Sequence, residues 1–385
     1  MHFSPILKYK NLRLSIAFTL FLALICLNGP AVYAQEHAVE AEKHEVADGK
    51  KAAEEKFDIS AFILHHIADA HSFHLWGEGE SSVGISLPVI LWTNNGPVAF
   101  MSGAFHHDDQ GRHVVEKNGM RFINHHEKIY YASETPNEHG VYAAVGKDHK
   151  VSNAMPIDLS ITKNVFTLIF SAVVIAILFI RVGNAYKKRT GKAPKGFQSL
   201  MEPVILFVRD DIAIPNLGSK YERFMPYLLT VFFFIWFNNV LGMVPFFPGG
   251  ANLTGNINLT FILALLTFLI TIVNGNKYYW KHILLPDVPW WLWPLMVVVE
   301  IIGVFTKPIA LMIRLFANIT AGHILVLALL CLIFVFKSFF IAPVSVVFVV
   351  FISLIELLVG FIQAFIFTVL TALFVGQAVE EHGAH

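Results

Sequence analysis

One arginine within an apolar stretch limits what this chain can become. Residues 308–330 are long enough to cross a bilayer, and Arg314 is their one full charge. A guanidinium keeps its proton, so it cannot enter lipid as a neutral group. Its cost at mid-bilayer is about 2.5 kcal/mol or more. The fold must therefore give Arg314 a carboxylate partner or a water-filled cavity, and we expect a functional role for it.

The composition is that of a membrane protein. Hydrophobic residues make up 55% of the chain and charged residues 15%. The formal net charge is zero, which argues against nucleic-acid binding. Cys26 and Cys331 both fall in apolar stretches and predict no disulfide framework. We predict an all-α polytopic membrane protein with about five membrane segments, a surface amphipathic helix and a small β-containing extracytoplasmic N-terminal region.

The first 34 residues have the pattern of a cleavable signal peptide. Basic residues precede a short apolar core at 14–27, and Val32-Tyr33-Ala34 supplies small residues before the expected cleavage site. An uncleaved anchor helix is the alternative. Residues 35–56 are rich in Glu, Lys, Ala and His and predict a linker with little fixed structure.

Residues 57–158 predict a polar extracytoplasmic domain. The stretch 83–92 is strand-like, and Asn94-Asn95-Gly96 predicts a hairpin to 98–101. A second hairpin is expected where Asn118-Gly119 joins 112–116 to 120–124.

Residues 159–379 predict the membrane domain, and 380–385 a short cytoplasmic tail. A basic cluster within 181–195 belongs in the cytoplasm by the positive-inside rule, which leaves the N-terminal domain outside. Residues 197–212 predict an amphipathic helix on the membrane surface. The last two segments exceed the ~20 residues that a span needs, so we expect them to be tilted or bent. The predicted spans are 161–180, 226–244, 257–273, 295–336 and 343–375.

The helix around Arg314 predicts a surface for a partner. Glu300, Lys307 and Arg314 lie seven residues apart and so fall on one face. The same face carries small side chains, which let another helix approach closely. Glu300 and Lys307 also fit a role at a helix end, with their charges reaching the interface. The small residues are Gly303, Ala310, Ala317 and Ala321.

The opposite face predicts a proton-carrying pair. His323 lies nine residues after Arg314 and so points away from it. Glu356 is the one carboxylate of the last segment, and a buried Glu must be protonated or paired. His323 and Glu356 could relay protons near neutral pH, or form a structural hydrogen-bonded pair. Asn318 and Gln363 could join helices through hydrogen bonds.

Several motifs together resemble subunit a of the rotary F-type ATP synthase. They are spread over roughly 159–381, and the pattern in the last two helices is specific. The motifs are Lys307-Pro308, Arg314-Leu-Phe-Ala-Asn318, Ala321-Gly322, Gln363-Ala-Phe-Ile-Phe-Thr-Val-Leu-Thr371, Phe237-Asn238-Asn239-Val240-Leu241-Gly242-Met243-Val244-Pro245 and Asn256-Ile-Asn258-Leu-Thr260.

The resemblance implies a stator subunit that forms two half-channels against a ring of c subunits and couples proton flow to rotation and ATP synthesis. Arg314 would face the ring carboxylate, with Asn318 and Gln363 helping to position it. Glu300 would belong to the inner half-channel. His323 and Glu356 match a channel pair whose residue types some members carry exchanged.

The same resemblance implies the surroundings of the chain. Its partners would be the c ring, a subunit b stator dimer and the rest of the F1Fo complex, in a bacterial inner membrane with a periplasmic N-terminal domain. ATP chemistry would occur on other subunits, so we expect no catalytic residue, no cofactor and no resident metal. Protons are the expected ion.

The long N-terminal region departs from this pattern, although Phe62-Ile-Leu-His65-His66 resembles a short motif of the family. A histidine group suggests zinc, but its spacing fits no specific motif. Two other hypotheses stay open: an ion-coupled secondary transporter and a membrane-anchored periplasmic metal-binding protein. The histidines are His65, His66, His71 and His74.

Overall fold

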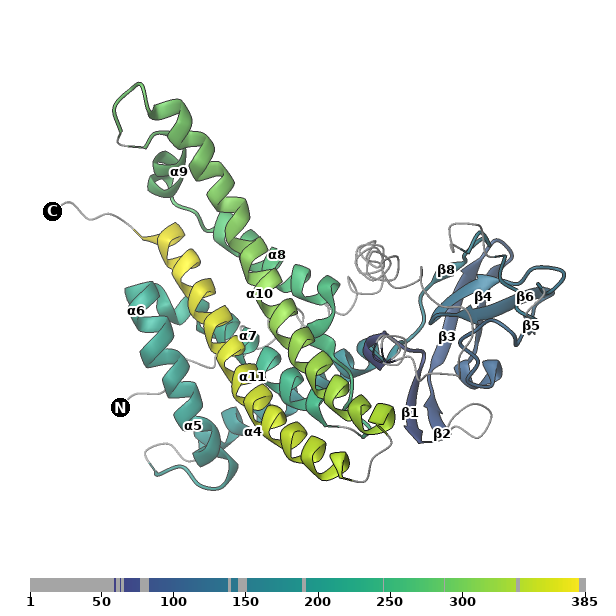
Figure 1. Cartoon of the computed structure of the whole chain (residues 1–385). Coiled ribbons are helices and arrows are strands. Elements are labelled where there is room, and N and C mark those ends of the chain that lie inside the picture. Colours follow the sequence, from purple (N-terminus) through teal and green to yellow (C-terminus); the bar gives the residue numbers. More distant parts are fainter. Residues whose placement is uncertain are drawn as a thin grey trace.

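The computed structural model describes residues 59, 63, 66–76, 83–137, 140–144, 151–188, 192–244, 246–286, 288–336 and 340–380. The predicted signal peptide, the whole predicted linker, all but the first residue of the predicted tail, and His65 lie outside these residues. Figure 1 shows a small region of strands beside a larger group of helices. This is the predicted class, a helical membrane protein with a small β-containing N-terminal region.

The β region, hereafter the β-domain, consists of three small antiparallel sheets. One pairs β1 with β2, the second has the order β4-β3-β8, and the third has the order β5-β6-β7. The strands are β1 Ser72–Trp76, β2 Val83–Ser86, β3 Pro88–Thr93, β4 Gly96–Met101, β5 Val115–Lys117, β6 Met120–His125, β7 Lys128–Tyr131 and β8 Ile157–Asp158.

Both predicted hairpins are present. Asn94 and Asn95 connect β3 to β4, and Asn118-Gly119 connects β5 to β6. Asn118 and Gly119 have φ of 51° and 71°, the left-handed conformation that a tight two-residue hairpin requires.

The single strand expected at 83–92 is wrong, because the chain changes sheets at Leu87. β2 pairs with β1, whereas β3 pairs with β4 and β8. The Leu87 N–H donates both to the His71 carbonyl beside β1, at 3.3 Å, and to Ser102 Oγ, at 3.0 Å. Pro88, which has no N–H to donate, then opens β3. Alternation of side chains alone does not reveal such a break.

Among the residues that the structure describes, four helices are long and apolar enough to span a membrane, and the bent pair α8 and α9 would make a fifth span. The long helices are α4 Lys163–Lys188, α7 Tyr221–Met243, α8 Ile257–Val273, α10 Trp293–Phe336 and α11 Ile341–Val379. Shorter elements are α5 Phe197–Phe207, the π-helical turn η3 Val208–Ala213, α6 Ile214–Leu217, the 3-10 turns η4 Gly218–Lys220 and η5 Leu253–Gly255, and α9 Lys277–Leu284.

The two final helices are the longest, as predicted. α10 has 44 residues and α11 has 39. At about 1.5 Å per residue, each is far longer than the ~30 Å apolar core of a bilayer. Figure 1 shows them lying side by side along one flank of the helical group.

Contacts at the two ends of the helices define their directions. At the end beside the β-domain, here the domain end, Phe247 from the α7–α8 loop packs on Phe73 with ring centroids 5.2 Å apart. At the opposite end, the far end, Lys220 and Asn276 side chains each donate to the Val379 carbonyl at 2.8 Å. Thus α4, α8 and α11 run from the domain end to the far end, and α7 and α10 run back.

α7 lies at the centre of the helical core. Its buried side chains include five consecutive residues, 231–235, so this part of the helix is buried on all sides. Aromatic rings from neighbouring elements complete the core, with Phe361 of α11 5.7 Å from Phe232 in an edge-on contact. The most deeply buried residues of α7 include Met225, Leu228, Phe232 and Ile235.

The segment predicted as one surface helix over 197–212 is helical but irregular. It continues through the π-helical turn η3 into α6 and ends at Leu217. The close approach of α6 to α11 explains a glycine there, because a Cβ on Gly376 would collide with the Asn216 carbonyl oxygen. α9 was not expected from the sequence.

Candidate functional site

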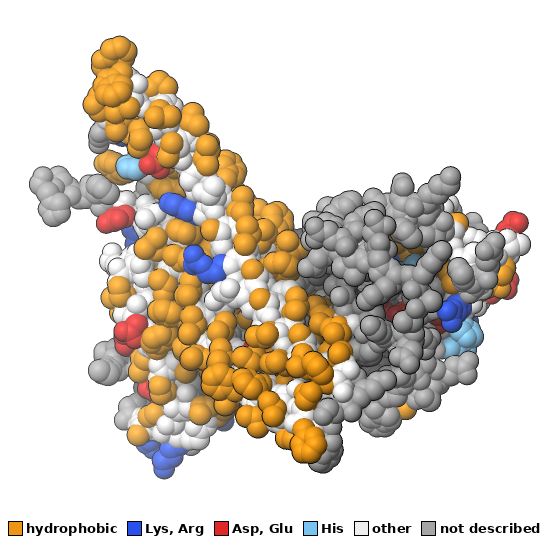
Figure 2. All heavy atoms as spheres, in the orientation of Figure 1, with side chains coloured by type: hydrophobic (Ala, Val, Ile, Leu, Met, Phe, Trp, Pro, Cys, Tyr) orange, Lys and Arg blue, Asp and Glu red, His pale blue; other side chains and the backbone are white. Residues whose placement is uncertain are grey.

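α10 has two contrasting faces along its middle. Leu311, Leu315 and Ile319 are buried in the helical core, at 2%, 1% and 6% exposure. Arg314 lies on the other side and is exposed. Figure 2 shows the surface over α10 and α11 as mainly hydrophobic, interrupted by basic side chains.

The small residues predicted to share the face of Arg314 are open. Ala310, Ala317 and Ala321 are exposed. A Cβ added to Gly303 would meet no atom within 4 Å. We call Gly303, Ala310, Arg314, Ala317 and Ala321 the open strip. A helix can approach such a strip closely, because no bulky side chain stands in the way.

Arg314 forms no hydrogen bond or ion pair with any residue that the structure describes. Asn318, one turn further, is likewise exposed. Gln363 is 5% exposed and lies in the packed part of α11. Within the described residues the chain therefore does not join Gln363 to Arg314 by a hydrogen bond.

His323 and Glu356 meet between α10 and α11. His323 Nδ1 lies 4.0 Å from Glu356 Oε1, and the side chains are 21% and 10% exposed. Gly322 lies beside the carboxylate, since a Cβ there would lie 3.4 Å from Glu356 Oε1. The structure thus brings together the two groups that the sequence nominated as a pair, away from the open strip.

A hydrogen-bonded amide lies one turn from this pair and was not nominated from the sequence. Asn239 of α7 donates from Nδ2 to the Gly360 carbonyl at 3.0 Å and accepts from Thr254 Oγ1 at 2.5 Å. Gly360 makes this possible, because a Cβ there would lie 3.1 Å from the Cβ of Asn239. The signal available in the sequence was the pair Asn238-Asn239 within an otherwise apolar helix.

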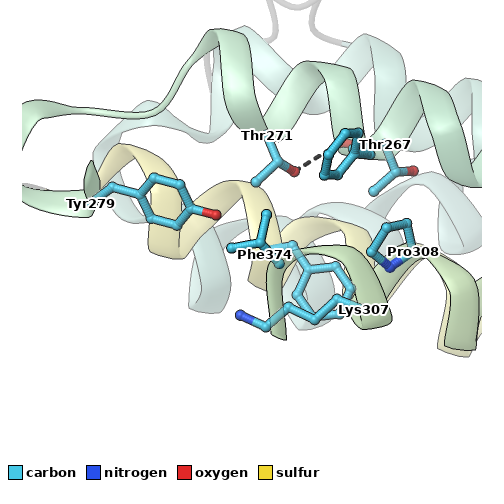
Figure 3. Close-up of a pocket in the computed structure, with 8 residues that line it drawn as sticks. Thr267, Thr271, Tyr279, Lys307, Pro308 and Phe374 are labelled. Atoms are coloured by element: carbon cyan, nitrogen blue, oxygen red, sulfur yellow. Dashed lines mark hydrogen bonds between the residues drawn. The ribbon is translucent and has the colours of Figure 1, made fainter. Parts of the chain in front are cut away.

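Towards the far end, Lys307 borders a narrow pocket (Figure 3). Its Nζ donates to Gln377 Oε1 at 3.1 Å and lies 5.4 Å from the centre of the Phe374 ring. Glu300 is half-buried two turns earlier on α10. The pocket is lined by Thr267, Phe268, Thr271, Tyr279, Val304, Lys307, Pro308 and Phe374.

Hydroxyl groups extend from this pocket into the helical core. Thr267 Oγ1 lies 3.0 Å from the Tyr227 hydroxyl and 3.3 Å from Thr371 Oγ1. Thr271 donates to the Thr267 carbonyl at 2.8 Å, as the dashed line in Figure 3 marks. Sequence reasoning missed these residues, because hydroxyl groups on three different helices carry no common spacing.

The histidine-rich region shows no metal site within the residues that the structure describes. No group of three His, Cys, Asp or Glu side chains could hold an ion there. His71 contacts two carboxylates instead, with Nε2 3.3 Å from Asp158 Oδ2 and Nδ1 3.6 Å from Glu127 Oε2.

Comparisons with known proteins identify the helical part. The family model described as ATP synthase A chain matches residues 165–376, and a model described as a domain of unknown function matches residues 62–159. The chain is 50% identical over 234 residues to ATP synthase subunit a of Chloroherpeton thalassium, covering 59% of this chain and 69% of the relative.

Other relatives agree. ATP synthase subunit a 2 of Prosthecochloris aestuarii is 48% identical over 233 residues, covering 59% of this chain and 71% of the relative. ATP synthase subunit a of Myxococcus xanthus is 45% identical over 240 residues, covering 59% and 77%. With a family match over more than half of its length, this multi-pass membrane chain belongs to the ATP synthase A chain family and is a subunit a of the Fo sector.

Proposed function

We propose that this subunit carries protons between two half-channels and the c ring, with Arg314 as the fixed charge between them. The observation that carries the proposal is the open strip. It presents one arginine on an exposed, apolar, small-residue face, without a counter-charge among the described residues. A helix of the ring that brings a carboxylate would supply that charge.

The outer half-channel would end at His323 and Glu356. Both lie towards the domain end, and the imidazole is a group that exchanges protons near neutral pH. The domain end is assigned to the periplasm, because the basic residues Lys187 and Lys188 lie at the far end of α4.

The inner half-channel would open at the far end. Glu300 and the hydroxyl-lined pocket beside Lys307 lie on that side. Asn318 would support Arg314 from the next turn, and Gln363 would line the packed side of α11. Protons then enter from the periplasm, neutralise a ring carboxylate, and leave inward when that site reaches Arg314.

Arg314 would keep the half-channels apart. A proton that passed directly between them would do no work, whereas a fixed guanidinium repels it and holds the arriving carboxylate in its charged form. Each elementary charge that crosses the membrane gains about 2.3 kcal/mol per 100 mV, and several crossings together drive ATP formation. The subunit itself would perform no ATP chemistry.

The assembly follows from this role. The chain would act in a bacterial inner membrane against the c ring, fixed by a subunit b dimer to the rest of the complex. Its β-domain would be periplasmic and its C-terminus cytoplasmic.

The test is ATP-driven acidification of inverted vesicles that carry the assembled complex. We expect Arg314→Ala to abolish acidification while subunit assembly and ATP hydrolysis by the soluble sector persist. Arg181→Ala is the matched control, because Arg181 is also an exposed arginine on a long helix. Normal acidification by Arg314→Ala would overturn the proposal.

A further inference from the structure

The chain turns sharply where α8 meets α9, which is bent by 102° from the direction of α8. Asn276, in the turn, ties this point to the end of α11. Its N–H donates to the Ala378 carbonyl and its Nδ2 to the Val379 carbonyl, both at 2.8 Å. α8 alone has 17 residues, enough to span the apolar core of a bilayer. A helix at this angle to a span lies close to the plane of the membrane surface.

α9 has an apolar row beside a basic row. Ile283 is buried against the rest of the protein. Trp280 and Leu284 lie four residues apart, so they share one side of the helix, and both are exposed. Lys277 and Lys281, also four residues apart, are exposed on the adjacent side, and their ammonium groups form no ion pair or hydrogen bond with a residue that the structure describes. This pattern is typical of a helix at the lipid–water interface.

Exposed tryptophans follow in the connection from α9 to α10. Trp290 and Trp291 are 86% and 66% exposed, and Trp293, which opens α10, is exposed as well. The Leu292 N–H donates to the Pro289 carbonyl at 2.9 Å and closes the turn that carries the first two rings. Figure 1 shows α9 and the start of α10 reaching beyond the end of α11, and Figure 2 shows a mainly hydrophobic surface at that tip.

We call residues 277–293 the tryptophan hairpin, and apolar surface runs onto it from both neighbouring spans. Val273, the last residue of α8, and Leu295, in the first turn of α10, are both exposed. By sequence the hairpin has one acidic residue, Asp287, against two lysines and His282, so its net charge is positive. Such an apolar surface beside basic groups fits a membrane better than water.

From this arrangement we propose that the tryptophan hairpin is an anchor for anionic phospholipids. Its indole rings and Leu284 enter the boundary between headgroups and acyl chains at the far end, and the ammonium groups of Lys277 and Lys281 contact lipid phosphate groups. The anchor holds the start of α10 at a fixed depth in the membrane. It thereby fixes the depth of Glu300, which follows Trp293 by two helical turns. This binding of lipid does not depend on how protons move through the subunit.

The chemistry of the hairpin favours lipid over a protein partner. Tryptophan prefers the level of the headgroups, where its ring lies in apolar surroundings and its N–H still reaches a polar group. Each lysine near an anionic leaflet strengthens binding by about fivefold. Both neighbouring helices belong to the membrane domain, so the hairpin stays at the surface of the bilayer and meets its headgroups first.

The experiment places a fluorophore on the hairpin of the assembled complex in phosphatidylcholine vesicles. The native cysteines of the complex are replaced by alanine, and Leu285→Cys, at an exposed position just after α9, carries the dye. Lipids with brominated acyl chains quench a dye only from within the membrane, whereas iodide quenches it only from water. We expect brominated lipid to quench the dye at position 285, and iodide to quench a dye at Lys192→Cys, in the exposed α4–α5 connection.

Brominated phosphatidylglycerol, mixed with phosphatidylcholine, then measures the headgroup preference. We expect the dye at Leu285→Cys to report phosphatidylglycerol binding at least about fivefold tighter than phosphatidylcholine binding. Lys277→Gln with Lys281→Gln should bring this ratio close to one. Lys192→Gln with Lys195→Gln removes the same charge from exposed positions at the same end of the molecule and should leave the ratio unchanged.

Three results would overturn the inference. Strong quenching by iodide at position 285 would mean that the hairpin lies in water, and quenching by neither agent would mean that a protein partner covers it. Equal binding of the two lipids in the chain with both lysines would reject the recognition of anionic headgroups. If the chain with both glutamines does not assemble, the lipid preference of the chain with both lysines decides by itself.

Discussion

Two polar sites on the same helix differ in where their partners lie. Arg314 is exposed on α10 and has no hydrogen bond or ion pair within the described residues. His323, nine residues further, is half-buried and meets Glu356 of α11. At about 100° per residue, nine residues turn the helix by half a revolution, so one helix serves two different spaces.

This difference separates a polar group that has its partner within the chain from one that is open to a partner on another subunit. A charge in a membrane needs a partner or water, and the chain supplies one for His323 but leaves the open strip clear of bulky side chains around Arg314. The strip is therefore best understood as half of an interface. The His323–Glu356 pair belongs to the chain alone.

The sharpest way to break this comparison is to keep the charge of Arg314 and change its shape. Lysine cannot offer two parallel N–H donors to a carboxylate. We expect Arg314→Lys to lose most ATP-driven proton pumping and Arg314→Gln to lose all of it, measured in inverted vesicles. Equal pumping by Arg314→Gln and the parent chain would mean that the exposed charge serves no partner.

The second prediction concerns the internal pair. Glu356→Gln removes a proton acceptor, and we expect proton flux to fall on the order of 100-fold, the usual scale for losing a positioned acid or base. Exchanging the two residues, His323→Glu with Glu356→His, should recover part of the flux, because both groups stay in contact. An exchanged chain as inactive as Glu356→Gln would contradict a relay between them.

Much of this contrast was predictable from the sequence. Spacing alone placed Arg314 and His323 on opposite faces of a membrane helix, and it placed Glu300, Lys307 and Arg314 on one face. The extents of α8, α10 and α11 followed closely from apolar runs. The sequence did not predict contacts that depend on the third dimension, such as Asn239 with Gly360 or Lys307 with Gln377.

The β-domain was less predictable. The two predicted hairpins carry local turn signals, whereas the two-residue strand β8 pairs with β3 from a distant part of the chain. The contacts of His71 join residues 56 and 87 positions away. No spacing rule reveals such contacts, because the tertiary fold alone brings these residues together.

The third prediction extends the comparison to His71, a buried cation whose partners are both internal. The pKa of His71 in the folded chain is about 10, above the ordinary value of 6.5, because burial, which lowers it, is outweighed by the hydrogen bonds and charges of Asp158 and Glu127. Its contribution to the free energy of unfolding is therefore complete below about pH 6.5 and is lost as the pH rises through about 10. The expected size is several kcal/mol.

Thermal unfolding of the purified chain between pH 6 and about 11 measures this contribution. His71→Gln should lower stability at neutral pH and flatten its decline towards alkaline pH. His113→Gln, an exposed histidine, is the control. If the stability of His71→Gln falls towards alkaline pH as steeply as that of the parent chain, another group is responsible for the fall.

The smallest expected effects come from replacing two glycines by alanine, one packed against a neighbouring helix and one with open space beside it. Gly360→Ala would bring a Cβ to 3.1 Å from Asn239 and should cost about 1–3 kcal/mol of stability. Gly303→Ala meets no atom within 4 Å and should leave the purified subunit unchanged, or up to about 1 kcal/mol more stable through helix propensity. The readout is thermal unfolding in detergent; equal losses would contradict the contrast between faces.

The most direct measurement is cross-linking from the open strip in the assembled complex. The two native cysteines are replaced by alanine, and one cysteine is introduced as Ala317→Cys or as Ile177→Cys, the latter on the exposed face of α4. A short thiol-reactive photo-cross-linker is attached, and the adducts are identified by mass. The account predicts adducts with the ring subunit from position 317 and none from position 177. Ring adducts from 177 alone would mean that the face carrying Arg314 does not meet the ring.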